Sequence, residues 1–66
     1  MQITVNGQPM NVEEGVSLEA LLARLEIRRE FTAVAVNRAV APKSAYAVTV
    51  LREGDRIEIV HPMGGG

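Results

Sequence analysis

A single stretch with helical periodicity, Ser17–Leu25, lies between two blocks of strand-like sequence and limits the folds that this chain can adopt. Its apolar residues recur at the spacing that places them on one face of a helix, and they are Leu18, Leu21, Leu22 and Leu25. Ser17 is a favoured N-cap residue, and the negative charge of Glu19 suits the N-terminal end of a helix. We expect one amphipathic helix of about three turns, ending near Ile27 to Arg29, with its leucines in the core.

The sequence before this helix predicts a β-hairpin. Apolar and polar residues alternate from Met1 to Val5 and again from Met10 to Val12. Between these segments, Asn6-Gly7 is a pair favoured in type I′ turns, which need a positive φ at both central positions. Pro9 has no amide hydrogen to donate to a sheet, so we expect the second strand to lie at the edge.

Further strands are predicted after the helix. Residues 33–36 are apolar on both faces, as expected for a central strand, and Asn37-Arg38 turns the chain into the short apolar piece Ala39–Ala41. Residues 43–46 indicate an irregular or single-turn connector. A last strand is expected from Arg56 to His61, with its two isoleucines on one face.

The order of these elements predicts an α+β fold, a mixed sheet of four to five strands with one helix across one face. If the helix acts as a crossover, the first and third strands are parallel neighbours. The opposite face of the sheet has no remaining segment of this chain to cover it, so that face is either polar or a docking surface. We expect residues 1–62 to form the domain and residues 63–66 to be a flexible tail.

Length and composition exclude several classes of function. A chain of 66 residues has a small core and no room for a substrate cavity with a catalytic shell. The formal net charge of −1, with interspersed signs, gives no electrostatic footprint for nucleic acid. The sequence contains no cysteine and no apolar run long enough to span a bilayer. Met1 opens directly into an alternating strand pattern, so we expect no signal peptide. We expect a cytoplasmic protein that binds no cofactor, metal or membrane.

The last four residues, Met63-Gly64-Gly65-Gly66, differ from the rest of the chain because glycines have no side chains to pack. Ordering each backbone residue costs about 1–2 kcal/mol, so we expect this segment to remain mobile. Such a slim backbone can enter a channel too narrow for side chains and present the α-carboxylate of Gly66 at its far end. The alternative interpretation is a fraying end without a function.

In order and spacing, these motifs resemble the ThiS family of sulfur carrier proteins from thiamine biosynthesis. The resemblance covers the whole chain, and the matching segments are Ile3–Gly7, Ser17–Leu25, Ala35–Asn37, Val40–Pro42, Glu53–Ile57 and Gly65–Gly66. It implies a ubiquitin-like β-grasp fold. It also implies a carrier protein rather than an enzyme.

The resemblance further implies a sequence of partners. An E1-like, ThiF-like adenylating enzyme uses ATP to activate the carboxylate of Gly66, and a sulfur donor then gives a thiocarboxylate. That sulfur is delivered to a ThiG-like thiazole synthase. Gly64 and Gly65 form the slim tail, and we expect Val60, Pro62 and Met63 to contribute to partner binding.

Other functions share this fold and remain open from the sequence. Related carriers serve molybdopterin synthase or tRNA thiolation, and a ubiquitin-like modifier would instead join its terminal glycine to a lysine. A β-grasp binding module would use the sheet face alone. Because one fold supports many functions, each alternative needs its own test. Copurification with a thiazole synthase or with a large molybdopterin synthase subunit separates the carriers, and the product formed at Gly66 separates a carrier from a modifier. Deletion of Gly65 and Gly66 would leave only a binding module functional.

Overall fold

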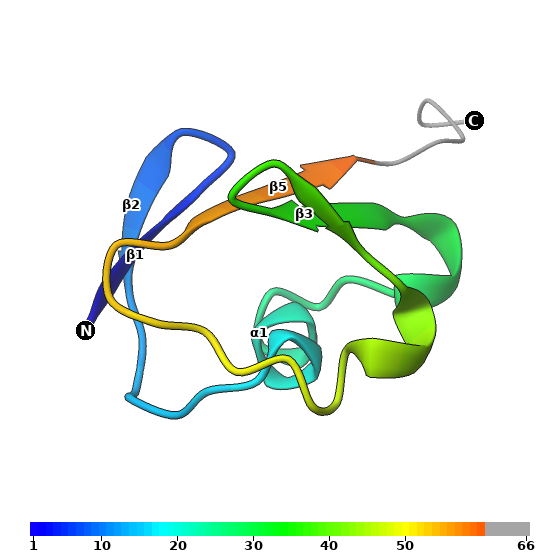
Figure 1. The fold of residues 1–66 in the computed structure, drawn as a ribbon, viewed down its shortest axis with the longest axis horizontal. Coiled ribbons are helices and arrows are strands. Elements are labelled where there is room, and N and C mark those ends of the chain that lie inside the picture. Colours follow the sequence, from blue (N-terminus) through cyan, green and yellow to red (C-terminus); the bar gives the residue numbers. More distant parts are fainter. Residues whose placement is uncertain (61–66) are drawn as a thin grey trace.

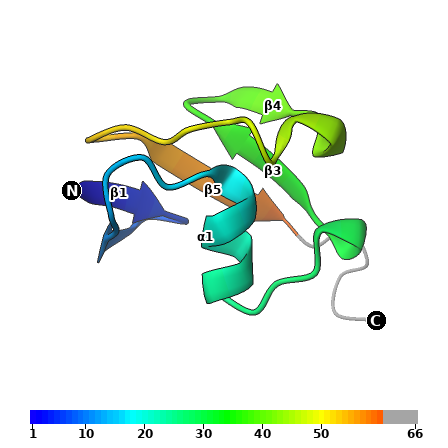
Figure 2. The same cartoon turned by 90° about the horizontal axis from the view of Figure 1, so that it is seen from below.

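The computed structural model describes residues 1–60, which form a five-stranded sheet with one α-helix across one face. In Figure 1 the strands form the upper layer with α1 beneath them, and Figure 2 shows both layers from below. In chain order the elements are β1 (Gln2–Val5), β2 (Gln8–Asn11), α1 (Leu18–Arg24), the 3-10 turn η1 (Arg29–Phe31), β3 (Ala33–Val36), β4 (Ala39–Ala41), the 3-10 turn η2 (Lys43–Ala45) and β5 (Arg56–Val60). The predicted α+β class is confirmed.

The last strand, β5, lies at the centre of the sheet, whose strand order is β2-β1-β5-β3-β4. It runs parallel to β1, with Val5 opposite Ile57, and antiparallel to β3, with Ala33 opposite Val60. The sheet is therefore mixed, as predicted, but the expectation that the first and third strands are neighbours is wrong. β5 separates them because it pairs with β1 along one edge and with β3 along the other. The edges of the sheet are formed by β2, which contains Pro9, and by β4, which has only three residues, and each of these features is typical of an edge strand.

Two hairpin turns have the same backbone conformation. Asn6 and Gly7 have φ angles of 50° and 83°, and Asn37 and Arg38 have φ angles of 52° and 72°. Positive φ at both central residues fits the type I′ turn, whose twist matches that of the flanking strands. The predicted hairpin at Asn6-Gly7, the turn at Asn37-Arg38 and the edge position of the strand with Pro9 are confirmed.

The start of α1 is fixed by its predicted cap and by the connector that follows β4. The hydroxyl of Ser17 accepts a hydrogen bond from the amide of Ala20 at 3.0 Å. The amides of Leu18 and Glu19 donate to the carbonyl oxygens of Thr49 and Tyr46, at 2.8 and 3.0 Å. These bonds satisfy amides of the first helical turn that have no partner inside the helix.

The end of α1 differs from the prediction. The helix has seven residues, about two turns, and does not reach the expected range Ile27 to Arg29. The amide of Glu26 donates to the Ala23 carbonyl at 3.1 Å, and that of Ile27 donates to the Leu22 carbonyl at 2.9 Å. This is a Schellman motif, with Glu26 at φ 59° in the position that glycine usually occupies.

The core lies between α1 and the inner face of the sheet, and it includes one aromatic residue from the connector. Tyr46 is completely buried, so the predicted connector contributes directly to packing. The buried hydrophobic residues are Ile3, Val12, Leu18, Leu21, Leu22, Val34, Tyr46, Leu51, Ile57 and Ile59. Within residues 1–60, no helix is long and apolar enough to cross a membrane.

Candidate functional site

The sheet face opposite α1, called here the outer face, is not covered by any other element of the described chain (Figures 1 and 2). Along β5, side chains alternate between the two faces. Ile57 and Ile59 are buried against the core, whereas Arg56, Glu58 and Val60 are exposed. The outward row of β5 therefore runs from a basic through an acidic to an apolar residue, and it ends where the described chain ends.

An apolar hollow lies on the outer face beside the end of β5. Strand pairing places Ala33 opposite Val60 and Ala35 opposite Val40, so these side chains share one face. Val60 and Val40 are 58% and 77% exposed, which is high for valines in a sheet. The residues that line this hollow are Asn6, Gly7, Ala33, Val34, Ala35, Val40, Glu58 and Val60.

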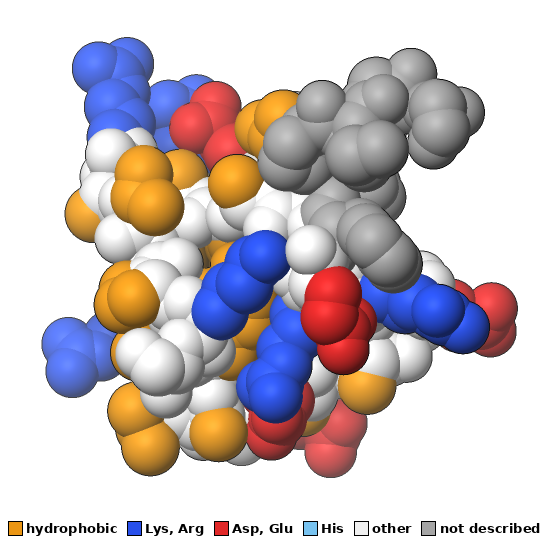
Figure 3. All heavy atoms as spheres, turned by 90° about the vertical axis from the view of Figure 1, so that its right-hand side faces the viewer, with side chains coloured by type: hydrophobic (Ala, Val, Ile, Leu, Met, Phe, Trp, Pro, Cys, Tyr) orange, Lys and Arg blue, Asp and Glu red, His pale blue; other side chains and the backbone are white. Residues whose placement is uncertain are grey.

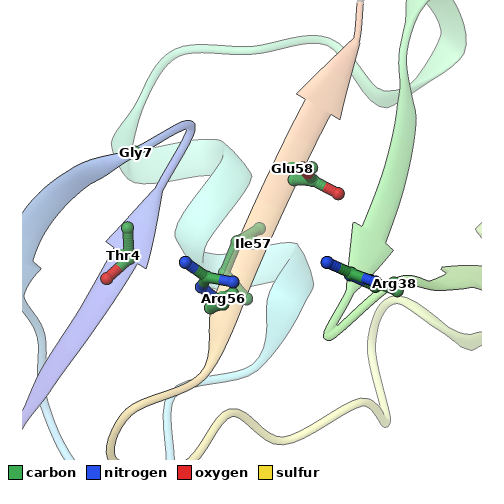
Figure 4. A pocket seen from close by; sticks show the side chains of 6 residues that line it. All are labelled: Thr4, Gly7, Arg38, Arg56, Ile57 and Glu58. Atoms are coloured by element: carbon green, nitrogen blue, oxygen red, sulfur yellow. The ribbon is translucent and has the colours of Figure 1, made fainter.

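A second hollow, called here the basic hollow, adjoins the first near the start of β5 (Figure 4). Arg56 projects from β5 and Arg38 from the turn between β3 and β4, so the two guanidinium groups enter the hollow from different elements. Glu58 lines both hollows. In the described chain the one ion pair is Arg29–Glu19 at 3.4 Å, and it involves neither Arg38 nor Arg56.

Two asparagine side chains, one from each hairpin turn, hydrogen-bond to the backbone of β5. The carboxamide of Asn6 contacts both backbone polar groups of Ile59, at 3.2 and 2.8 Å. The carboxamide of Asn37 accepts from the Arg56 amide and donates to the Asp55 carboxylate, both at 3.0 Å. The strand that carries the outward row is therefore positioned by both hairpin turns, and its side chains are presented at fixed places on the outer face.

Most of the predicted site residues lie outside residues 1–60, which the structure describes. Val60 lies on the outer face and is exposed, as a partner contact requires. Pro62, Met63, Gly64, Gly65 and Gly66 lie outside the described residues. Sequence reasoning did not identify Arg38, Arg56 or Val40 as site residues. The sequence does not show which strands are neighbours, and only the pairing of β3, β4 and β5 brings these side chains together on the outer face.

The chemistry of the outer face is that of a contact surface. Among residues 1–60, no group of three or more His, Cys, Asp or Glu side chains could hold a metal ion. On the outer face, the basic Arg38 and Arg56, the acidic Glu58 and the apolar Val60 lie close together. Basic, acidic and apolar side chains also interleave on the neighbouring side of the molecule, on the right of Figure 1, which Figure 3 shows. Such mixed polarity suits recognition of a protein surface better than binding of a nucleic-acid backbone.

The chain is similar to proteins of thiamine biosynthesis. The ThiS family model matches residues 3–66. The sulfur carrier protein ThiS of Escherichia coli is 32% identical over 66 residues, which cover all of both chains. A crystal structure of the thiamine biosynthesis protein ThiS from Geobacter metallireducens superposes with a TM-score of 0.88 at 35% identity, again over the full length of both chains.

A further similarity is to a much longer protein. Thiazole synthase of Magnetococcus marinus is 47% identical over 66 residues, which cover the whole of this chain and 20% of the synthase. The chain thus spans about a fifth of the length of the thiazole synthases that it matches.

Proposed function

The chain belongs to the ThiS family, and from that membership we propose that it carries sulfur for the thiazole of thiamine as a thiocarboxylate on Gly66. It is a sulfur carrier protein, a co-substrate rather than an enzyme. The observation that carries the proposal is the extent of the family match, which runs from the first hairpin through Gly64, Gly65 and Gly66.

The chemistry of a carboxylate explains why a carrier of this kind needs activation. A carboxylate resists nucleophilic attack, so an E1-like adenylating enzyme first joins the α-carboxylate of Gly66 to AMP, with release of pyrophosphate from ATP. A sulfide-level sulfur nucleophile then attacks the acyl carbon and AMP leaves, which gives the thiocarboxylate. Because the sequence has no cysteine, this chain has no thiol to carry a persulfide, and the terminal acyl group is the proposed point of attachment.

The outer face supports this proposal by offering a surface next to the terminal segment. Val60, the last described residue, lines the apolar hollow, so a protein docked there would lie close to the point where residues 61–66 begin. We propose that Val60, Pro62 and Met63 contact the partner enzymes, with Gly64 and Gly65 allowing the backbone to enter a narrow active site.

Thiazole synthase is the proposed acceptor of the sulfur. The similarity to a domain-sized part of two thiazole synthases, at 47% and 38% identity, supports a functional link between carrier and synthase. The adenylating enzyme is proposed from the family resemblance and from the need to activate the carboxylate of Gly66 before sulfur can add.

The test is the intact mass of the chain after incubation with the adenylating enzyme, ATP and a sulfur donor. We expect one oxygen of the C-terminal peptide to be replaced by one sulfur, and no change when ATP is omitted. Conjugates of higher mass would instead indicate a protein modifier. An unchanged mass under complete conditions would contradict the proposal.

A further inference from the structure

Arg38 occupies a backbone position that favours glycine. The two hairpin turns have nearly the same φ angles, but the first is Asn6-Gly7 and the second is Asn37-Arg38. Glycine adopts a φ of 72° without steric cost, whereas an arginine there is disfavoured by its Cβ atom. A residue kept in an unfavourable backbone region suggests that its side chain has a role outside the turn.

The surroundings of Arg38 place a second arginine in the same hollow. Arg56 lines the basic hollow with it, and Figure 4 shows their side chains on the same side of the sheet. The nearby carboxylate of Asp55 is engaged in its own turn, where it accepts hydrogen bonds from the Arg52 amide at 2.8 Å and from Asn37 at 3.0 Å. Of the described residues that line the hollow, Glu58 is the one with an acidic side chain.

We propose that Arg38 and Arg56 receive carboxylate groups from the surface of thiazole synthase while an apolar side chain of the synthase enters the apolar hollow beside Val60. This inference rests on the proposed function. Guanidinium groups bind carboxylates with directional, paired hydrogen bonds. Charge pairs at an interface fix orientation and speed association, and apolar contacts supply much of the affinity.

The order of side chains on β5 gives this docking a direction. Arg56, Glu58 and Val60 follow one another along the outward row, and the two hollows lie in the same order. A synthase surface with acidic groups at one end and an apolar group at the other matches this row in one orientation only. That orientation places the synthase over the end of β5, from which residues 61–66 continue.

The experiment measures the affinity of the full chain for the thiazole synthase of the same organism at several salt concentrations. The test variants are Arg38→Gly and Arg56→Gln, and the control is Arg24→Gln, an exposed arginine in the last turn of α1. Each substitution removes one positive charge. We expect each test variant to bind about threefold to tenfold more weakly and with a smaller dependence on salt, and the control to bind as the unmodified chain does.

Each other outcome counts against the inference. Equal binding by all variants, or an equal loss in the control, would show that Arg38 and Arg56 have no specific role. The affinity for the adenylating enzyme is measured in parallel, and a loss for that enzyme without a loss for the synthase would assign the arginines to the enzyme and contradict the inference. Failure of the unmodified chain to bind the synthase would remove the proposed partner, whereas failure to form the thiocarboxylate would contradict the proposed function separately.

Discussion

The side chain of Asn6 hydrogen-bonds to the backbone of Ile59 in the way that the backbone of a neighbouring strand would. Its Nδ2 donates to the carbonyl oxygen of Ile59 at 3.2 Å, and its Oδ1 accepts from the Ile59 amide at 2.8 Å. The backbone amide of Asn6 donates to the Ile57 carbonyl at 2.8 Å, one step earlier in the same ladder. Because the chain turns away from β5 at Asn6, the carboxamide extends the pairing of β1 with β5 by one further step.

The first prediction tests this contact with Asn6→Gly, which keeps the positive φ of the turn and removes the carboxamide. We expect a loss of about 1–2 kcal/mol in the free energy of unfolding, because two partly buried hydrogen bonds to Ile59 disappear. Urea denaturation measures the loss. Hydrogen exchange should accelerate at the Ile59 amide far more than at the amides of β5 that face β3, and equal acceleration on both sides would contradict a local role.

The second prediction concerns the unfavourable backbone of Arg38. Replacement by glycine should stabilise the protein by about 0.5–1 kcal/mol, because the φ of 72° then carries no Cβ penalty. The matched change is Gly7→Ala in the other turn, where an added Cβ would contact nothing within 4 Å. That variant should lose stability through its backbone alone. Thermal unfolding compares both, and a loss of stability in Arg38→Gly would show that its side chain supports the fold.

Local signals in the sequence predicted the parts of the fold that depend on neighbouring residues. Ser17 caps α1, Asn6-Gly7 forms the predicted turn, and the strand containing Pro9 lies at the edge. The end of α1 was missed because Glu26, not glycine, takes the positive φ of its C-terminal motif. The ubiquitin-like β-grasp fold implied by the family resemblance is confirmed by the match to the ThiS crystal structure.

Features that depend on long-range pairing were not predictable in the same way. Alternation indicates that a strand exists and which residues share a face, but it does not give the neighbours of that strand. The central place of β5 was therefore missed. The two hollows were missed for the same reason, since Val40 meets Ala35, and Arg38 meets Arg56, only after β3, β4 and β5 have paired.

The third prediction separates binding from stability on the outer face. Val60→Asp should weaken binding to thiazole synthase about tenfold or more, because it places a charge in the apolar hollow. Since Val60 is 58% exposed, the free energy of unfolding should change by less than about 1 kcal/mol. The control is Val48→Asp, at a 77% exposed valine in the segment beside α1 (Figure 1). Equal effects of the two substitutions on binding would contradict a specific apolar contact.

The fourth prediction concerns the buried hydroxyl of Tyr46. This oxygen has no hydrogen-bond partner within residues 1–60, although the side chain is completely buried. Burial of an unpaired polar group is unfavourable, so Tyr46→Phe should leave stability unchanged or raise it by up to about 1 kcal/mol. Urea denaturation measures the change. A loss of stability would contradict this expectation and would show that the hydroxyl makes a stabilising hydrogen bond.

The fifth prediction tests whether Gly66 is needed for chemistry and not for folding. Gly66→Ala, or one residue added after Gly66, should abolish thiocarboxylate formation, because a side chain or a displaced carboxylate no longer fits a narrow active site. The free energy of unfolding should remain within about 0.5 kcal/mol of the unmodified value, since the core is formed by residues 3–59. Intact mass reports the reaction and urea denaturation the stability. If either change unfolds the domain, the glycine segment is part of the fold and the carrier mechanism proposed for it is wrong.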